Sequence, residues 1–220
     1  MATATVRPAT DDDVGAIMAI QDRTWRTAYA GLLPEEAFAG LTSDAARSHW
    51  GDAVHAGDGF HLFVAVEGDA TVGFAAAARY AGADGMAIAE VSTLLVEPRW
   101  GRRGHGGRLL AAVAAALRES GSDSGRAWVA EADTASRNFY GRAGWAPDGA
   151  VRTLDTGTST VREVRHARNQ KHMDALAEKI AEVDPDILVV VGDDQHEWFQ
   201  EDIQPSFTVF YGDQVINTAL

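Results

Sequence analysis

The chain has 220 residues, 46% of them hydrophobic, and a formal net charge of −13. This acidity argues against a nucleic-acid-binding protein, because phosphate contacts need a basic face. The sequence contains no cysteine, which excludes a disulfide framework, a thiolate metal site and a cysteine nucleophile. No basic region followed by an apolar run opens the chain, and no apolar stretch approaches the length of a membrane span. We therefore expect a cytoplasmic protein without membrane contacts.

The charge is unevenly distributed along the chain. Residues 1–166 carry 16 arginines and 21 acidic residues, a net charge of −5, whereas residues 167–220 carry three basic and 11 acidic residues, a net charge of −8. Both lysines of the chain, Lys171 and Lys179, fall in this last quarter. Such a change in composition at one point predicts two parts, 1–166 and an acidic tail 167–220.

Helix and strand signals follow one another in a regular order. Thr10 and the three acids after it are typical of a helix N-terminus, and Pro34 suits the first turn of a second helix. Further elements are predicted in chain order as strands at 61–67, 71–80 and 86–97, a helix over about 108–120, a strand at 127–133, a helix at 136–143, and strands near 149–155 and 160–166. This order predicts an α+β fold with a mixed sheet.

A glycine- and arginine-rich stretch, VEPRWGRRGHGGRLL at residues 96–110, joins a predicted strand to a predicted helix. Unpaired N–H groups at a helix N-terminus bind anions, and glycines let a phosphate approach the backbone. Arg102, Arg103 and Arg108 add forked donors. The dinucleotide fingerprint fails at Leu109, and the Walker pattern fails at 107–108. The stretch therefore predicts a phosphate site, with a tight turn bearing solvated arginines as the alternative.

Two blocks of sequence resemble one known family. Val96-x-Pro98 followed by Gly104-x-Gly106 resembles the GCN5-related N-acetyltransferases (GNAT), in which this loop cradles the pyrophosphate of acetyl-CoA. Residues 133–145 resemble the family's second block, Asn-x-x-Ala-x-x-Phe-Tyr-x-x-x-Gly-Phe/Trp. The runs 25–34, 145–149 and 161–165 are also similar to members of it, so the resemblance covers about residues 4–166.

The resemblance implies a GNAT-like, mostly antiparallel sheet flanked by helices, and direct acetyl transfer from acetyl-CoA to an amine. The coenzyme contacts that it implies are Leu95, Val96, Arg102, Arg103, Gly104, His105, Gly106, Gly107 and Ser136. Two departures stand out. Arg102 occupies a position that is usually glycine, where it would crowd the loop, and Asp133 replaces an asparagine. We expect Asp133 to turn away from the coenzyme or to cap the following helix.

Acetyl transfer to an amine needs a base and an acid. Glu90 lies 14 residues before Gly104, the spacing at which several family members carry the base, and Tyr140 matches the tyrosine that serves as general acid beside the coenzyme sulfur. A solvated strand glutamate and an aromatic core residue are the respective alternatives.

The acceptor pocket is expected beside the link between the first two helices. Trp25, Tyr29 and Gly31 lie there, although ordinary packing explains an aromatic pair equally well. No histidines show metal-ligand spacing, so no metal is expected. The acceptor class is a small-molecule or peptide amine, its identity is not given by the sequence, and a homodimer is left open.

The tail has a different character. A helix is predicted at 169–183, a buried-type strand at 187–191 and another strand at 207–211. The segment resembles an incomplete piece of the class III extradiol ring-cleavage dioxygenases (LigB-like), with His196 at the position of a ferrous-iron ligand, against the alternative of a solvated acidic loop. Besides acetyl transfer, two further functions stay open: a non-catalytic acyl-CoA-binding or interaction module, and extradiol cleavage by the tail.

Overall fold

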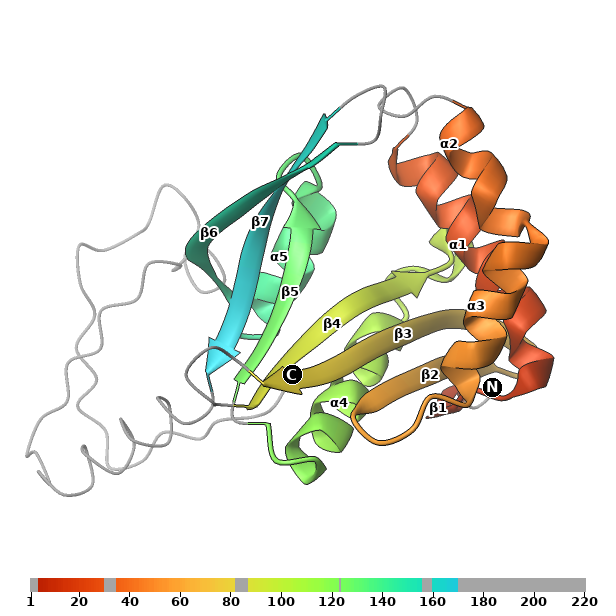
Figure 1. Ribbon diagram of the computed structural model, residues 1–220, viewed down its shortest axis with the longest axis horizontal. Helices are drawn as coiled ribbons and strands as arrows, with labels where there is room; N and C mark the ends of the chain where they lie inside the picture. The colour runs from red at the N-terminus through yellow and green to blue at the C-terminus, as the bar shows by residue number, and fades with distance from the viewer. Residues whose placement is uncertain (1–3, 30–34, 82–86, 123, 156–159, 170–220) are drawn as a thin grey trace, which may run out of the picture. The chain divides into compact units, whose positions relative to one another are not determined.

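The computed structural model describes residues 4–29, 35–81, 87–122, 124–155 and 160–169 (Figure 1). The strands are β1 (Ala4–Pro8), β2 (Phe60–Glu67), β3 (Ala70–Ala81), β4 (Ala87–Val96), β5 (Ser124–Ala130), β6 (Ala146–Asp155) and β7 (Thr160–Asn169). The helices are α1 (Val14–Ala28), α2 (Glu36–Ala39), α3 (Asp44–Val54), α4 (His105–Glu119) and α5 (Thr134–Arg142), with short 3₁₀ turns at Asp11–Asp13, Gly40–Thr42 and Pro98–Trp100.

The described strands form one mixed sheet in the order β1-β2-β3-β4-β5-β7-β6. Every neighbouring pair is antiparallel except β4 and β5, which are parallel and are joined by the crossover helix α4. The expected α+β fold with a mostly antiparallel sheet is therefore confirmed. The predicted tail lies outside the described residues from 170 onward, as does Gly31.

Helices cover both faces of the sheet, because successive side chains of each strand point to opposite faces. In β3, Ala75 and Ala77 join the core under α4 and α5, whereas Phe74 and Ala76 join the core under α1 and α3. Each core contains a buried tryptophan, Trp145 in the first and Trp50 in the second. The sheet thus has an α4/α5 face and an α1/α3 face, which Figure 1 shows as helices behind and beside the strands.

A β-bulge in β4 opens the sheet. Ala76 and Ala77 of β3 pair with Thr93 and Val91, which leaves Ser92 as the extra residue, and its hydroxyl donates to the Ala76 carbonyl at 3.1 Å. Val91 is also the last residue of β4 that pairs with β5. A bulge bends its strand and ends regular pairing. Beyond Val91 the strands β4 and β5 diverge, as Figure 1 shows.

Several boundaries differ from the predicted ones. The sequence patterns missed β1 and α3, and α4 begins at His105 rather than near Arg108, so that Gly106 and Gly107 lie in its first turn. The earlier start follows from Gly104, which caps the helix in the left-handed region at φ 81°. None of the helices that the structure describes has the length and apolar character needed to cross a bilayer.

Candidate functional site

The gap between β4 and β5 contains a cleft of about 710 Å³. Its lining comes from α1, the splayed ends of β4 and β5, the loop before α4, α5 and β7. The cleft brings together most of the predicted site residues: Trp25, Tyr29, Leu95, Val96, Arg102, Gly104, His105, Gly106, Gly107, Ser136 and Tyr140. Of the predicted set, Glu90 and Arg103 do not line it.

The N-terminus of α4 gives one wall of the cleft a set of backbone donors. The first intrahelical bond in this turn runs from the Arg108 amide to the Gly104 carbonyl, at 3.1 Å. The amides of His105, Gly106 and Gly107 precede it and lack partners within the helix. With the helix dipole they favour an anion at this end.

The glycines of this turn serve different purposes. A Cβ on Gly106 would lie 3.2 Å from the ring of Phe139, so this glycine lets α5 approach α4. A Cβ on Gly107 would meet nothing within 4 Å. The space beside Gly107 is therefore open, and it is the glycine of α4 best placed to let a ligand approach the backbone.

Arg102 adopts the left-handed conformation at φ 60°, and it is the one non-glycine residue with positive φ in the described part of the chain. This conformation costs a residue with a Cβ about 1–2 kcal/mol. The structure explains why glycine suits this position. Arg102 also lines the cleft.

Arg103 points away from the cleft. Its guanidinium forms an ion pair with Glu67 at 3.2 Å and lies over the Trp100 ring at 4.7 Å. The other oxygen of Glu67 bonds to Nε2 of His105 at 2.8 Å, and His105 is 1% exposed. These contacts anchor the loop to the end of β2. Arg103 and the His105 ring thus hold the loop in place, while the His105 backbone supplies a donor.

The start of α5 forms the next part of the wall. Asp133 caps this helix, accepting from the Ser136 amide at 2.9 Å and from its hydroxyl at 2.6 Å. The expected capping role is confirmed. The Ser136 hydroxyl is engaged in this cap, although the residue lines the cleft as predicted.

Tyr140 lies on the α4/α5 face of the sheet and lines the cleft from that face. Its ring lies 5.2 Å from that of Phe139, 5.4 Å from that of Trp145 and 6.0 Å from that of His166, measured between ring centroids. Burial raises the pKa of the Tyr140 phenol well above its usual range. The phenol therefore keeps its proton at neutral pH, as a general acid must.

Aromatic side chains of α1 line the other side of the cleft. The rings of Trp25 and Tyr29 meet edge to face at 5.6 Å. Burial raises the pKa of the Tyr29 phenol, and the charges of Asp133 and Glu163 add to this effect. Asp133 and Glu163 line the same cleft as Tyr29, although they come from other elements.

Glu90 lies in the part of β4 that still pairs with β5. Its carboxylate accepts from the Tyr80 hydroxyl at 3.0 Å and from Arg126 Nε at 2.9 Å. The cleft is lined instead by Glu163 of β7, which sequence patterns did not identify. The sequence predicted a strand at 160–166, but it did not show that this strand pairs with β5.

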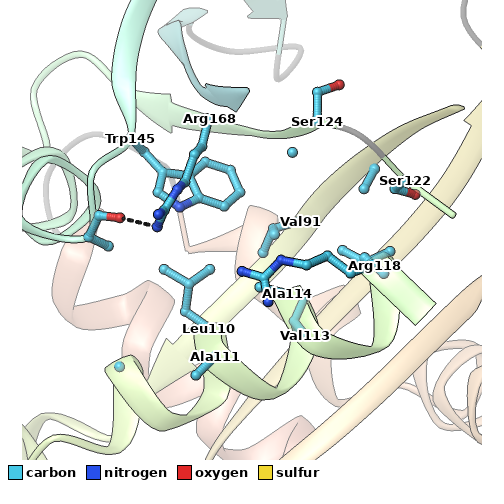
Figure 2. A pocket seen from close by; sticks show the side chains of 15 residues that line it. Val91, Leu110, Ala111, Val113, Ala114, Arg118, Ser122, Ser124, Trp145 and Arg168 are labelled. Atoms are coloured by element: carbon cyan, nitrogen blue, oxygen red, sulfur yellow. Dashed lines mark hydrogen bonds between the residues drawn. The ribbon is translucent and has the colours of Figure 1, made fainter. Parts of the chain in front are cut away.

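A second cavity, of about 330 Å³, lies between α4, the start of β5 and Trp145. Figure 2 shows its largely apolar lining, with Arg118 and Arg168 beside it. Arg168 donates to the Ala143 carbonyl at 3.0 Å. Small side chains on α4, Ala111 and Ala114, border this space. Among the described residues, no three metal-binding side chains gather into a ligand set.

Residues 58–147 match the family model described as an acetyltransferase (GNAT) domain. No curated protein matches the chain. Among solved structures, the PaiA N-acetyltransferase of Thermoplasma acidophilum, in complex with coenzyme A, is 16% identical, with a TM-score of 0.61 over 76% of this chain and 99% of that one. The ribosomal-protein-alanine N-acetyltransferase of Brucella melitensis is 20% identical, with a TM-score of 0.62 over 75% and 99%.

A GNAT-family acetyltransferase of Bacillus cereus is 18% identical, with a TM-score of 0.54 over 76% of this chain and 97% of that one. At these identities the likeness concerns the fold. The likeness in fold and the family-model match both agree with the resemblance that the sequence blocks at 96–106 and 133–145 show to the GNAT family. Residues 58–147 thus match the GNAT acetyltransferase domain model, and the described residues have the GNAT fold.

Proposed function

We propose that this protein is an acetyl-CoA-dependent N-acetyltransferase that transfers acetyl directly to an amine. The observation that carries the proposal is the cleft in the opened sheet, which has the N-terminus of α4 on one wall and the protonated phenol of Tyr140 on the same side. Phosphate groups suit the first feature, and a departing thiolate needs the second. The coenzyme A bound to the PaiA enzyme supports the choice of coenzyme.

The residues present fit acetyl-CoA. The amides of His105, Gly106 and Gly107, with Arg102, would hold the pyrophosphate. Successive amides of a strand point to opposite sides. The Glu97 amide bonds to β3 at 2.9 Å, so the Val96 amide faces the gap, where it would polarise the thioester carbonyl. The Leu95 amide faces β3, and its side chain lines the cleft.

Direct transfer requires only these groups and a base. The amine nitrogen attacks the thioester carbon, the carbon–sulfur bond breaks, and the thiolate takes the Tyr140 proton. The chain has no cysteine that could carry the acetyl group first. Glu90, the base predicted from the sequence, does not line the cleft, so no residue is assigned to the base in this proposal. Trp25 and Tyr29 would border the acceptor.

The test is acetyl-CoA titration followed by thiol release with a panel of primary amines. Because the protein lacks cysteine, a thiol reagent reports only free coenzyme. We expect saturable binding, amine-dependent thiol release and an N-acetylated product by mass spectrometry. Binding without acetylation of any amine would favour a non-catalytic acyl-CoA-binding module, and absence of binding would overturn the proposal.

A further inference from the structure

Two glutamates of the sheet have nearly the same surroundings. Glu90 pairs with Arg126 Nε at 2.9 Å, and Arg126 lies over the Tyr80 ring at 4.5 Å. Glu163 pairs with Arg152 Nε at 2.6 Å, and Arg152 lies over the Trp128 ring at 4.5 Å. Each is therefore a carboxylate held by an arginine that stacks on an aromatic ring. Their chemistry alone does not distinguish them.

Their positions along the sheet do distinguish them. Residues directly opposite each other on paired strands share a face. Glu90 lies opposite Arg126 of β5, and Glu163 lies opposite Ala130 of the same strand. Both therefore project toward the α1/α3 face, four residues apart along β5, which is about 13 Å. Glu90 lies in the paired part of the sheet, and Glu163 lies at the open end.

The surroundings of Glu163 suit a cation. It is 9% exposed and lines the cleft with Trp25, Tyr29 and Trp128. Arg152 and Arg165 already lie over the Trp128 ring, at 4.5 and 5.6 Å from its centroid. Trp25 and Tyr29 therefore supply the aromatic surface that, with a desolvated carboxylate, attracts an ammonium group. The Arg152 that holds Glu163 stands outside the cleft lining, and its side chain is 41% exposed. Arg152 thus positions the carboxylate from behind without closing the cleft.

Tyr140 approaches from the opposite face. Tyr140 belongs to the core under α4 and α5, which includes Val129 of β5. Glu163 aligns with Ala130, on the other face of that strand. The cleft connects the two faces through the gap, since Tyr140 and Glu163 both line it. In acyl transfer the base acts at the attacking nitrogen and the acid at the departing sulfur, so a base and an acid that reach the cleft from different faces can act on the same thioester.

We infer that Glu163 receives the acceptor as a primary ammonium ion and removes its proton. This inference rests on the proposed function. One ammonium proton passes to the Glu163 carboxylate, the nitrogen lone pair forms the bond to the thioester carbon, and the carbon–sulfur electrons leave with sulfur, which takes the Tyr140 proton. The second nitrogen proton restores the Tyr140 phenol, and Glu163 then releases its proton to solvent, so that one proton is released per turnover. The acceptor class is therefore an amine that is cationic in water.

The test compares Glu163→Gln with the matched variant Glu90→Gln in the full-length protein. The amine is the fastest acceptor among phenethylamine, putrescine and an alanyl peptide. We expect Glu163→Gln to lower kcat/KM for the amine by about 100-fold, with the Kd for acetyl-CoA changed less than about twofold. Glu90→Gln should stay within about threefold of the unaltered protein.

Arg152→Gln separates a chemical role of Glu163 from a structural one. If the ion pair mattered only for folding, Arg152→Gln would reproduce the loss and lower the melting temperature equally. We expect it instead to cause a smaller loss than Glu163→Gln, because the carboxylate remains and loses only a positioning contact. The pH–rate profile of Arg152→Gln should still show one basic group, whereas Glu163→Gln should abolish that limb. Equal losses in the Glu163 and Glu90 variants, or a larger loss at Glu90, overturn the inference while leaving acetyl transfer intact. An unaltered protein that acetylates no amine overturns the proposed function, and this assignment with it.

Discussion

The two sides of the cleft are built differently. The proposed coenzyme side comes from one short stretch at the start of α4, in which Arg102 and residues 104–107 line the cleft and the backbone amides are the expected donors. The proposed acceptor side consists of side chains from three distant elements, Trp25 of α1, Trp128 of β5 and Glu163 of β7. A contiguous stretch can be recognised from spacing alone, whereas the second set exists only once the sheet has formed. Changes on one side should therefore leave the function of the other intact.

Tyr140→Phe is expected to have the largest effect, because it removes the proposed general acid. The phenylalanine ring keeps the contacts with Phe139 and Trp145. We expect kcat to fall by about 100-fold, while the Kd for acetyl-CoA stays within about twofold. Single-turnover kinetics and titration measure the two quantities separately. Unchanged turnover would remove Tyr140 from the chemistry.

Trp25→Ala tests the acceptor side alone. It removes an aromatic surface that lines the cleft and meets Tyr29 edge to face. Loss of the aromatic contact that Trp25 would make with the acceptor is worth about 0.5–1.5 kcal/mol. The KM for the amine should therefore rise by about three- to tenfold, while the affinity for the coenzyme stays unchanged. Steady-state kinetics at saturating acetyl-CoA would show this. A weaker coenzyme affinity with an unchanged amine KM would reverse the assignment of the two sides.

Arg102→Gly tests a conflict on the coenzyme side. Glycine accepts the positive φ of this position, so the free energy of unfolding should rise by up to about 1 kcal/mol. Coenzyme affinity should fall modestly, because a guanidinium at the cleft is lost. Denaturant melts and titration give the two opposite changes. A variant that is both less stable and tighter binding would contradict this reading of the loop.

His166, whose ring is near that of Tyr140, should give the fold a small pH dependence. Burial lowers the pKa of His166 below its ordinary value of 6.5, and the charge of Arg137 acts in the same direction. As pH falls through that value, the unfolded chain binds a proton that the folded chain does not, so stability declines. His166→Gln should flatten this decline in urea melts between pH 7 and 5, conditions chosen to bracket the titration. An unchanged slope would show that other groups cause it.

Local patterns predicted much of the fold and many of the residues that line the cleft. Helix and strand periodicity placed most elements, and the family blocks located the loop and Tyr140. Three features depended on distant partners. Arg103 turns away from the cleft because it pairs with Glu67, which lies 36 residues earlier in the chain. The gap opens at Ser92, where the pairing of β4 with β3 shifts by one residue. Glu163 lines the cleft because β7 lies between β5 and β6. Spacing along the chain contains none of these.

The most direct test of the central claim, that α4 begins at a coenzyme site, is acetyl-CoA titration of the unaltered protein, Gly107→Asp and Gly107→Asn. Both side chains enter open space, and an acid in the first turn stabilises a helix. The account predicts that the unaltered protein binds and that the Asp variant, although at least as stable as the Asn variant, binds about tenfold more weakly, because its charge faces the pyrophosphate. Equal affinities in the two variants, or no binding by the unaltered protein, would contradict it.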